Sequence, residues 1–273
     1  MLKINVIKFK VEIDEYLNQF GNFLLLSFSK ISQKKNKDFK KNIILKDCLK
    51  NQSAYIIANG PSLNKFNLRK LKDHNLFFMN RGFLHKDYEF LKPKFHFIID
   101  EKLNSGVWPI KFIDDIFKLN PDTKLFLNSK WSNNEKFKNY KIKFGDNIFW
   151  IDTRLFFTKF HKLRKINLEY ITYGNAVSGA AFISSLYMGV NEVNLLGQDL
   201  NGLCYDIINE ESHFYGNNEE NRSKNIEDIT DDLLSMSISI RNWTNIIKYS
   251  KNNNIKVVNL SDSSLLNLIL KDD

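Results

Sequence analysis

The 273-residue chain has few of the residues that mark metal sites and disulfide frameworks. It contains two cysteines, Cys48 and Cys204, together with only four prolines and eleven glycines. Two isolated cysteines form neither a zinc-ligand pattern nor a disulfide framework. Because disulfides belong to oxidising compartments, we expect a protein of the reducing cytoplasm that holds no structural metal.

Long apolar runs are also lacking. The first residues contain no apolar stretch followed by a small-residue cleavage site, so we expect no signal peptide. The most apolar segment, residues 20–31, is interrupted by Gly21, Asn22, Ser27 and Lys30. It is shorter than the roughly 20 apolar residues that a spanning helix requires, and we expect no membrane span.

Positive charge gathers in the first 50 residues. They hold eleven lysines and five acids, whereas the whole chain carries a net charge of +9. Apolar residues recur there at helical spacing, namely Leu17, Phe20, Phe23, Leu24 and Phe28. We therefore predict a basic amphipathic helical extension over residues 1–50. Packing on the main domain is the default expectation, and peripheral contact with a membrane or a homo-oligomer remains open.

From Ala54 onward, short apolar runs alternate with helical patterns. The predicted strands are Ala54–Ala58, Leu76–Met79, Phe95–Ile99, Lys124–Leu127, Ile148–Ile151, Glu192–Leu196 and Lys256–Val258. The predicted helices are Leu63–Leu71, Val107–Leu119, Ser178–Met188, Ile226–Lys251 and a short one from Asp262. This alternation predicts an α/β fold over residues 51–273, with a Rossmann-like, mainly parallel sheet covered by helices on both faces. We expect the polar stretch at about 200–225 to form a lid.

Polar residues follow several predicted strands at their carboxyl ends, where parallel sheets bind ligands. These residues are Asn59, Gly60 and Ser62 after the first strand, Asn80 and Arg81 after the second, Asp100 after the third, and Asp199 after the strand that follows Gly189. Asn175, Ser178 and Gly179 stand at the start of a helix. Their convergence predicts one ligand site at this edge of the sheet.

Each of these motifs also has a plain structural explanation. Asn59-Gly60-Pro61-Ser62 could present backbone N–H groups to a phosphate at a helix start, or could be an ordinary turn capped by Ser62. Ser178-Gly179 could equally serve close packing of a helix on the sheet. Asp199 could accept hydrogen bonds from a ribose, or could tie down a loop.

His213 is the candidate general base. It lies in a polar loop after the Asp199 strand, and its ordinary pKa of about 6.5 suits proton abstraction near neutrality. Glu210 and Glu211 are close enough in sequence to orient the ring or to raise its pKa. The alternative is a surface histidine. We interpret His74, His85, His96 and His161 as structural or exposed.

Taken in order, these motifs resemble a known family. The segments are Ile57–Leu63, Met79–Arg81, Val177–Gly179 with Tyr187–Asp199, Ser212–Phe214 and Asn259–Leu266. The set resembles the bacterial sialyltransferases of glycosyltransferase family 42, and equally resembles uncharacterised relatives encoded in surface-polysaccharide gene clusters. Both belong to a clan with archaeal 6-hydroxymethylpterin pyrophosphokinases. The resemblance runs from about Ala54 to the C-terminus.

The resemblance implies a metal-independent, inverting glycosyltransferase. It would move a nonulosonic acid, such as sialic acid or Kdo, from a CMP-activated donor to a glycan or lipid-linked glycan acceptor in surface polysaccharide synthesis. We expect the protein in the cytoplasm, and peripheral contact with the inner face of the membrane remains open. CMP-sugar is its substrate, and no cofactor or metal is expected. The lack of any Asp-x-Asp pair, with which many glycosyltransferases hold a metal, agrees.

The resemblance also implies roles for individual residues. His213 would be the base and Tyr205 a tyrosine facing the departing phosphate. The donor-binding residues would be Asn59, Gly60 and Ser62 at the phosphate and ribose, Asn80, Ser178 and Gly179 at the donor's polar groups, and Asp199 at the ribose or cytosine.

Two departures from the family pattern leave the sugar open. Asn175 stands where the sialyltransferases have an arginine, and Leu200-Asn201 where a tyrosine is expected. Pseudaminic, legionaminic or another CMP-linked acid is therefore as compatible as sialic acid. A second hypothesis is a pterin-type pyrophosphokinase that uses ATP and Mg²⁺, held by Asp100 and Asp199. The third is a non-enzymatic basic protein that binds nucleic acid; it ranks last because the excess charge lies outside the α/β core.

Overall fold

The computed structural model describes residues 6–33, 37–160, 166–174, 176–208, 210–216 and 226–271. Its strands are β1 Ser53–Ile57, β2 Asn75–Met79, β3 Phe95–Ile98, β4 Lys124–Asn128, β5 Ile148–Leu155, β6 Ile171–Tyr173, β7 Glu192–Leu196 and β8 Lys256–Asn259. Its α-helices are α1 Val6–Gln33, α2 Lys37–Lys40, α3 Tyr88–Leu91, α4 Glu101–Ser105, α5 Phe112–Leu119, α6 Glu135–Phe144, α7 Val177–Tyr187, α8 Gly202–Ile207, α9 Ile226–Asn252 and α10 Leu266–Lys271.

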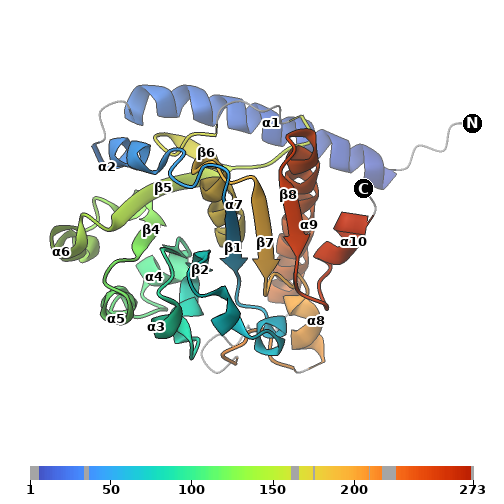
Figure 1. Ribbon diagram of the computed structural model, residues 1–273. Coiled ribbons are helices and arrows are strands. Elements are labelled where there is room, and N and C mark those ends of the chain that lie inside the picture. The colour runs from blue at the N-terminus through green and yellow to red at the C-terminus, as the bar shows by residue number, and fades with distance from the viewer. Residues whose placement is uncertain are drawn as a thin grey trace, which may run out of the picture.

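The strands form one sheet in the order β6-β5-β4-β3-β2-β1-β7-β8, and every neighbouring pair is parallel (Figure 1). This confirms the predicted Rossmann-like α/β fold. β6 was not predicted, because three residues are too few to show a pattern. The helix predicted over Leu63–Leu71 is wrong: the chain forms two short 3₁₀ helices there, Pro61–Lys65 and Leu68–Leu71.

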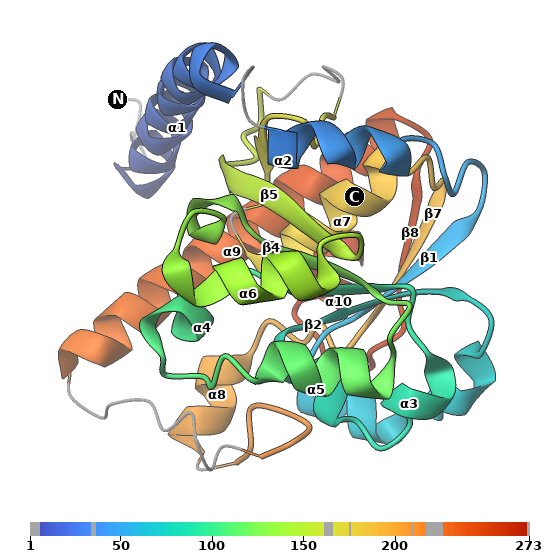
Figure 2. The ribbon, with the colours of Figure 1, turned by 90° about the vertical axis from the view of Figure 1, so that its left-hand side faces the viewer.

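Helices cover both faces of the sheet, as predicted. One hydrophobic core joins the sheet to α7 and α9, where Phe182 meets Trp243 edge-on with ring centroids 5.8 Å apart. A second core joins the opposite face to α3, α5 and α6, and includes Ile113 and Phe137. Figure 2 shows α3, α5 and α6 together in front of the sheet, with α7 and α9 behind it. The sheet is therefore buried on both sides, which explains its continuous apolar strands.

Phenylalanines form a row across the α7 face of the sheet. Phe97 and Phe126 stack on neighbouring strands with centroids 4.2 Å apart, and Phe126 continues to Phe149 at 5.4 Å. Phe77 stacks on Phe95 at 4.5 Å. Cross-strand aromatic pairs of this kind each contribute roughly 0.2–1 kcal/mol. Part of the unusual phenylalanine content thus supports the sheet.

The predicted N-terminal extension consists of two structurally different parts. Residues 37–50 are packed into the α/β body: the Asn42 side chain donates to the carbonyl of Trp150 at 2.8 Å, and Leu45 and Leu49 lie in the core. Helix α1 lies along the outside (Figure 1). Within the described residues, no helix is long and apolar enough to cross a bilayer.

Helix α1 contacts the body through polar side chains. Asn22 accepts a hydrogen bond from the N–H of Phe156 at 3.1 Å and donates to its carbonyl at 2.8 Å. Glu15 accepts from the N–H of Lys159 at 2.9 Å. Phe20, Phe23, Phe28 and several other large apolar residues of α1 are exposed. Helix α1 therefore packs on the main domain through its polar side.

Candidate functional site

The strand order reverses between β1 and β7, and ligands bind at such switch points in open parallel sheets. Strands β2 to β6 lie on one side of β1, whereas β7 and β8 lie on the other. The turn Asn59–Ser62 follows β1, the loop Gly197–Asp199 follows β7, and Ser261 follows β8. Two of the four loops predicted at the ligand-binding edge, those after β1 and β7, thus lie side by side, next to the loop after β8.

Hydrogen bonds join these loops directly. Gly60 donates its N–H to the carbonyl of Gly197 at 2.9 Å, and Ser62 donates its N–H to Oδ2 of Asp199 at 3.0 Å. The Ser62 hydroxyl donates to Oδ1 of the same carboxylate and lies 3.0 Å from Oγ of Ser261. Asp199 is only 4% exposed. The structural explanation of Asp199, that it ties down a loop, is thus realised.

These bonds bear on the interpretation of the Asn-Gly-Pro-Ser turn as a phosphate site, which stays a prediction. The N–H groups of Gly60 and Ser62 already have protein acceptors, and Pro61 has no N–H to offer. The helix that follows is a five-residue 3₁₀ segment with little dipole. Gly60 is required by packing, because a Cβ at this position would lie 2.4 Å from Oδ2 of Asp199. The turn is a structural joint between β1 and β7.

The Ser178-Gly179 motif also serves packing. A Cβ at Gly179 would lie 2.3 Å from the carbonyl oxygen of Gly174, so glycine lets the start of α7 approach the end of β6. Ser178 is buried beside it. Their predicted contacts with the donor remain predictions, and Asn175 lies outside the described residues.

The loop that carries His213 docks on the tips of β1 and β2. Phe214 donates its N–H to the carbonyl of Asn59 at 2.9 Å. The Arg81 guanidinium lies over the Tyr215 ring, 4.7 Å from its centroid. The imidazole of His213 stacks on the same Tyr215 ring, with ring centroids 5.0 Å apart and an angle of 16° between the ring planes. His213 is half-buried in this loop, and its role as the general base stays a prediction.

Two asparagines at the same tips hold buried oxygen atoms without hydrogen-bond partners. Asn59 donates through Nδ2 to the carbonyl of Met79 at 3.3 Å, while its Oδ1 has no donor. Asn80 has φ of +46°, and its Oδ1 also has no donor. An unsatisfied buried acceptor costs about 1–3 kcal/mol, and natural proteins contain few. These two oxygens lie on adjacent strand tips, where O–H or N–H donors of a ligand would satisfy them.

His96 fixes the position of Asn80. Its Nε2 lies 2.9 Å from the carbonyl oxygen of Asn80, and its Nδ1 lies 2.9 Å from the hydroxyl of Tyr88. A carbonyl only accepts, so Nε2 carries the proton and Nδ1 accepts from the tyrosine. Complete burial lowers the pKa of His96 to about 4, so the ring is neutral near pH 7. The interpretation of His96 as structural is consistent with these contacts.

A cavity of about 580 Å³ opens farther along the carboxyl edge of the sheet. Asp100 after β3, Asn128 of β4, Arg154 of β5 and Val177 of α7 line it. Asp100 uses one oxygen to accept from the N–H of Lys102 at 3.0 Å. The guanidinium of Arg154 makes two bonds to Asp152, at 2.8 and 2.6 Å, which raise the pKa of Arg154. The cavity thus presents both a carboxylate and a fixed guanidinium.

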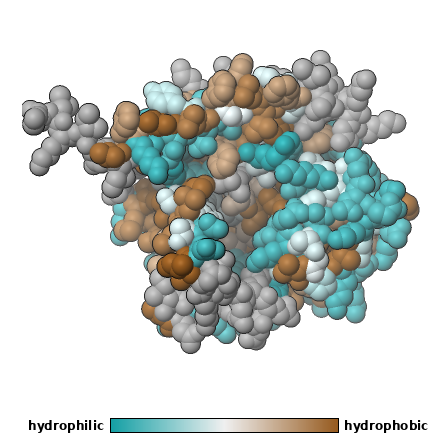
Figure 3. Space-filling model, turned by 180° about the vertical axis from the view of Figure 1, so that it is seen from behind, coloured by the Kyte–Doolittle hydropathy of each residue, from teal (hydrophilic) through white to brown (hydrophobic). Residues whose placement is uncertain are grey.

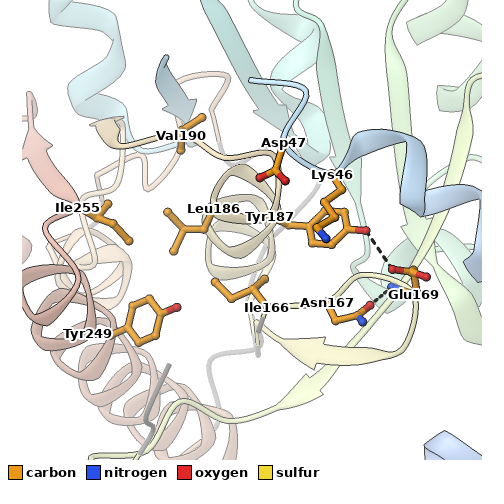
Figure 4. Close-up of a pocket in the computed structure, with 10 residues that line it drawn as sticks. All are labelled: Lys46, Asp47, Ile166, Asn167, Glu169, Leu186, Tyr187, Val190, Tyr249 and Ile255. Atoms are coloured by element: carbon orange, nitrogen blue, oxygen red, sulfur yellow. Dashed lines mark hydrogen bonds between the residues drawn. The ribbon is translucent and has the colours of Figure 1, made fainter. Parts of the chain in front are cut away.

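A smaller cavity of about 260 Å³ lies at the other end of α7 (Figure 4). Its walls are largely apolar, and they include Ile166, Leu186 and Val190. The Tyr187 hydroxyl donates to Glu169 at 3.3 Å, so its main polar pair is internally satisfied. It lies at the amino edge of the sheet, away from every predicted site residue.

Tyr205 lies half-buried in α8, and its carbonyl accepts from the N–H of Glu210 at 2.8 Å. Part of the predicted lid, residues 209 and 217–225, lies outside the described residues. Among the residues that are described, no group of three or more His, Cys, Asp or Glu side chains is placed to hold a metal ion. The expectation of a metal-free mechanism stays a prediction.

No family model matches the chain, and no curated protein matches it. The chain is similar in fold to solved glycosyltransferase structures. The sialyltransferase CstII from Campylobacter jejuni, in complex with cytidine-5'-monophosphate, shows 18% identity over 81% of this chain and 84% of its own, with a TM-score of 0.46. The monofunctional alpha-2,3-sialyltransferase Cst-I from the same organism shows 16% identity over 79% and 78%, with a TM-score of 0.42. A MAf glycosyltransferase from Magnetospirillum magneticum AMB-1 shows 13% identity over 60% of this chain and 27% of its own, with a TM-score of 0.36. At these identities the likeness concerns the fold.

Sequence reasoning missed Asn128 and Arg154, which line the larger cavity. The strand predicted at Ile148–Ile151 ends too early, because β5 continues to Leu155 through polar residues. Alternation of buried and exposed positions at its end was the signal that could have extended it. Asn128 directly follows the predicted strand Lys124–Leu127, but it was not named as a candidate site residue.

Proposed function

We propose that this protein is an inverting, metal-independent glycosyltransferase. It transfers a nonulosonic acid from a CMP-activated donor to a glycan or lipid-linked glycan at the cytoplasmic face of the membrane. The observation that carries the proposal is the 2.9 Å bond from Phe214 to the carbonyl of Asn59. It brings the loop that carries His213 to the tip of β1, where Asn59 keeps an unbonded oxygen. The motif order that resembles family 42 supports the same assignment.

In this proposal the chemistry is divided between the loop and the strand tips. His213 takes the proton from the acceptor hydroxyl while CMP leaves. Asn59 and Asn80 accept hydrogen bonds from the donor through Oδ1, which would satisfy both buried oxygens. The Arg81 guanidinium, held over Tyr215, adds positive charge near the departing phosphate. Asp199 acts as a positioning residue, because its carboxylate is fully engaged by Ser62.

A thermal-shift screen tests the nucleotide. The full chain is heated with CMP, CDP, UDP, GDP or ATP, each with and without Mg²⁺. A ligand that binds only the folded state raises Tm in proportion to the logarithm of its concentration over Kd. We expect CMP to give the largest shift and Mg²⁺ to leave it unchanged. Stabilisation by ATP that depends on Mg²⁺ would instead identify a pyrophosphokinase, and no shift with any nucleotide would refute both.

A matched pair of variants locates the site. Asn80→Ala removes an unbonded buried oxygen, and we expect the CMP shift to shrink to that of at least tenfold weaker binding. Asn51→Ala is the control, since Asn51 also has positive φ, at +60°, but is exposed and lies at the amino edge. Equal CMP shifts in the two variants would place the nucleotide elsewhere.

A further inference from the structure

Helix α1 turns its apolar side to solvent. The large exposed apolar side chains on that side are Val6, Phe9, Ile13, Leu17, Phe20, Phe23, Leu24 and Phe28. We call this set of residues the α1 outer face. Phe20 is 61% exposed and Phe28 is 69% exposed, so most of each ring lies in solvent. From behind, hydrophobic atoms run along the top edge of the molecule, where α1 lies (Figure 3). Contiguous apolar surface of this kind marks a binding surface.

The inner face of the same helix is polar. Glu15, Asn22 and Ser29 recur every seven residues and are buried. Asn22 bonds to both backbone groups of Phe156, and the Thr158 hydroxyl donates to Gln19 at 2.7 Å. These specific bonds fix the rotation of α1 about its axis. The outward direction of the apolar residues is therefore a property of the fold.

The acidic side chains of α1 also lie on the side that contacts the body. Its three acids all point toward the body: Glu12 pairs with Lys159 at 3.2 Å, Asp14 with Arg241 at 3.5 Å, and Glu15 binds the backbone of Lys159. No acid of the helix remains to oppose an anion at the outer face. Lys10 lies exposed beside it. The helix itself has three lysines and three acids, and further lysines flank it in the sequence, Lys3 before it and Lys34, Lys35 and Lys37 after it.

We propose that the α1 outer face binds the surface of an anionic lipid bilayer, with the helix lying flat along it. A 28-residue helix presents an apolar ridge about 42 Å long, and aromatic and branched side chains of such a ridge enter the acyl boundary while lysines meet anionic headgroups. A second copy of the chain fits this face less well, because it would also bring together the lysines that flank the two helices in the sequence.

This inference stands apart from the proposed transfer reaction, but the two fit together. α1 is bonded to Phe156, which also lines the 580 Å³ cavity at the carboxyl edge of the sheet. A bilayer bound to α1 therefore lies next to an element of that cavity.

Vesicle sedimentation tests the inference with the full chain. The protein is mixed with vesicles of phosphatidylcholine alone or of phosphatidylcholine and phosphatidylglycerol at 3:1. The test variant combines Phe9→Gln, Phe20→Gln and Phe28→Gln, which keep good helix formers at exposed positions. The control combines Ile142→Gln and Leu268→Gln, which are exposed apolar residues of α6 and α10. Point variants are preferred to deletion because Leu45 and Leu49 belong to the core.

We expect the wild type to bind the anionic vesicles at least tenfold more tightly than the neutral ones, and less tightly as salt rises. The α1 variant should lose at least tenfold of this binding, and the control none. Equal binding by the α1 variant, or no vesicle binding by the wild type, would overturn the inference. A dimer in sedimentation velocity that only the α1 variant abolishes would assign the face to a second copy. Unchanged CMP thermal shifts in the α1 variant keep the two proposals separate.

Discussion

The backbone N–H of Ser62 donates to the carboxylate of Asp199 at 3.0 Å, so the loops after β1 and β7 are joined across the switch point of the sheet. The same carboxylate receives the Ser62 hydroxyl. One buried acid therefore organises two segments that are 137 residues apart in the sequence. Because both partners are buried, we expect these hydrogen bonds to contribute to the free energy of unfolding.

Asp199→Ala should destabilise the fold strongly. It leaves the N–H and the hydroxyl of Ser62 buried without their acceptor, and each unsatisfied donor costs about 1–3 kcal/mol. We expect a loss of roughly 3 kcal/mol in the free energy of unfolding, measured by urea titration. Asp262→Ala, which removes an exposed carboxylate nearby in space, should cost less than about 0.5 kcal/mol. Similar losses of unfolding free energy in the two variants would contradict the role of Asp199 in joining the two loops.

Gly60→Ala and Gly21→Ala should change stability in opposite directions. A Cβ at Gly60 would lie 2.4 Å from Oδ2 of Asp199 and 2.5 Å from the carbonyl of Gly197, so the joint must open. A Cβ at Gly21, inside α1, meets nothing within 4 Å. Alanine there should stabilise by up to about 1 kcal/mol through helix propensity. Thermal unfolding compares the two, and a Gly60→Ala protein as stable as the wild type would show that the turn has room.

His96 should make stability fall in mild acid. Its pKa is lowered by burial to about 4 in the folded protein, while the unfolded chain has the ordinary value near 6.5. As pH falls below 6.5, the unfolded state binds the proton first, so stability is full above 6.5 and decreases toward pH 4. The loss is of the order of 3 kcal/mol. Burial lowers the pKa of His85 too, which adds in the same direction.

Urea titrations at pH 7.5 and 5.0 measure this effect. His96→Gln should be less stable at pH 7.5, because the bonds to Asn80 and Tyr88 are altered, but should lose less on acidification than the wild type. His74→Gln, at an exposed position, should keep the wild-type pH dependence. An unchanged pH dependence in His96→Gln would show that this ring titrates normally.

His213→Ala should abolish transfer and spare nucleotide binding. General base catalysis contributes roughly 10²–10⁴-fold, so kcat for release of CMP from a CMP-sugar should fall by at least 100-fold. The CMP thermal shift should persist. Added imidazole should restore part of the rate if the ring acts as a base, and should restore nothing if its stacking on Tyr215 only shapes the loop. Turnover near that of the wild type would end the assignment.

The sequence alone determined the class of fold and the edge at which the candidate site lies. Apolar runs such as Ala54–Ala58 and Glu192–Leu196 are local signals, and the alternation of such runs with helices leaves few arrangements other than a parallel sheet. The stop of α7 at Gly189 is equally local, since its φ of +89° suits glycine. Polar residues after strand ends then fall at one edge for geometric reasons.

Only the tertiary structure decided what these polar groups and apolar faces contact. The sequence cannot show that the N–H groups of Gly60 and Ser62 are taken by Gly197 and Asp199, because those partners are more than 130 residues away. The rotation of α1 is another such case. Its periodicity reveals two faces, but the backbone groups of Phe156 and Lys159 bind the polar one and leave the apolar one outside. Periodicity is a property of the helix alone, whereas the choice of face depends on the acceptors and donors that the rest of the fold presents.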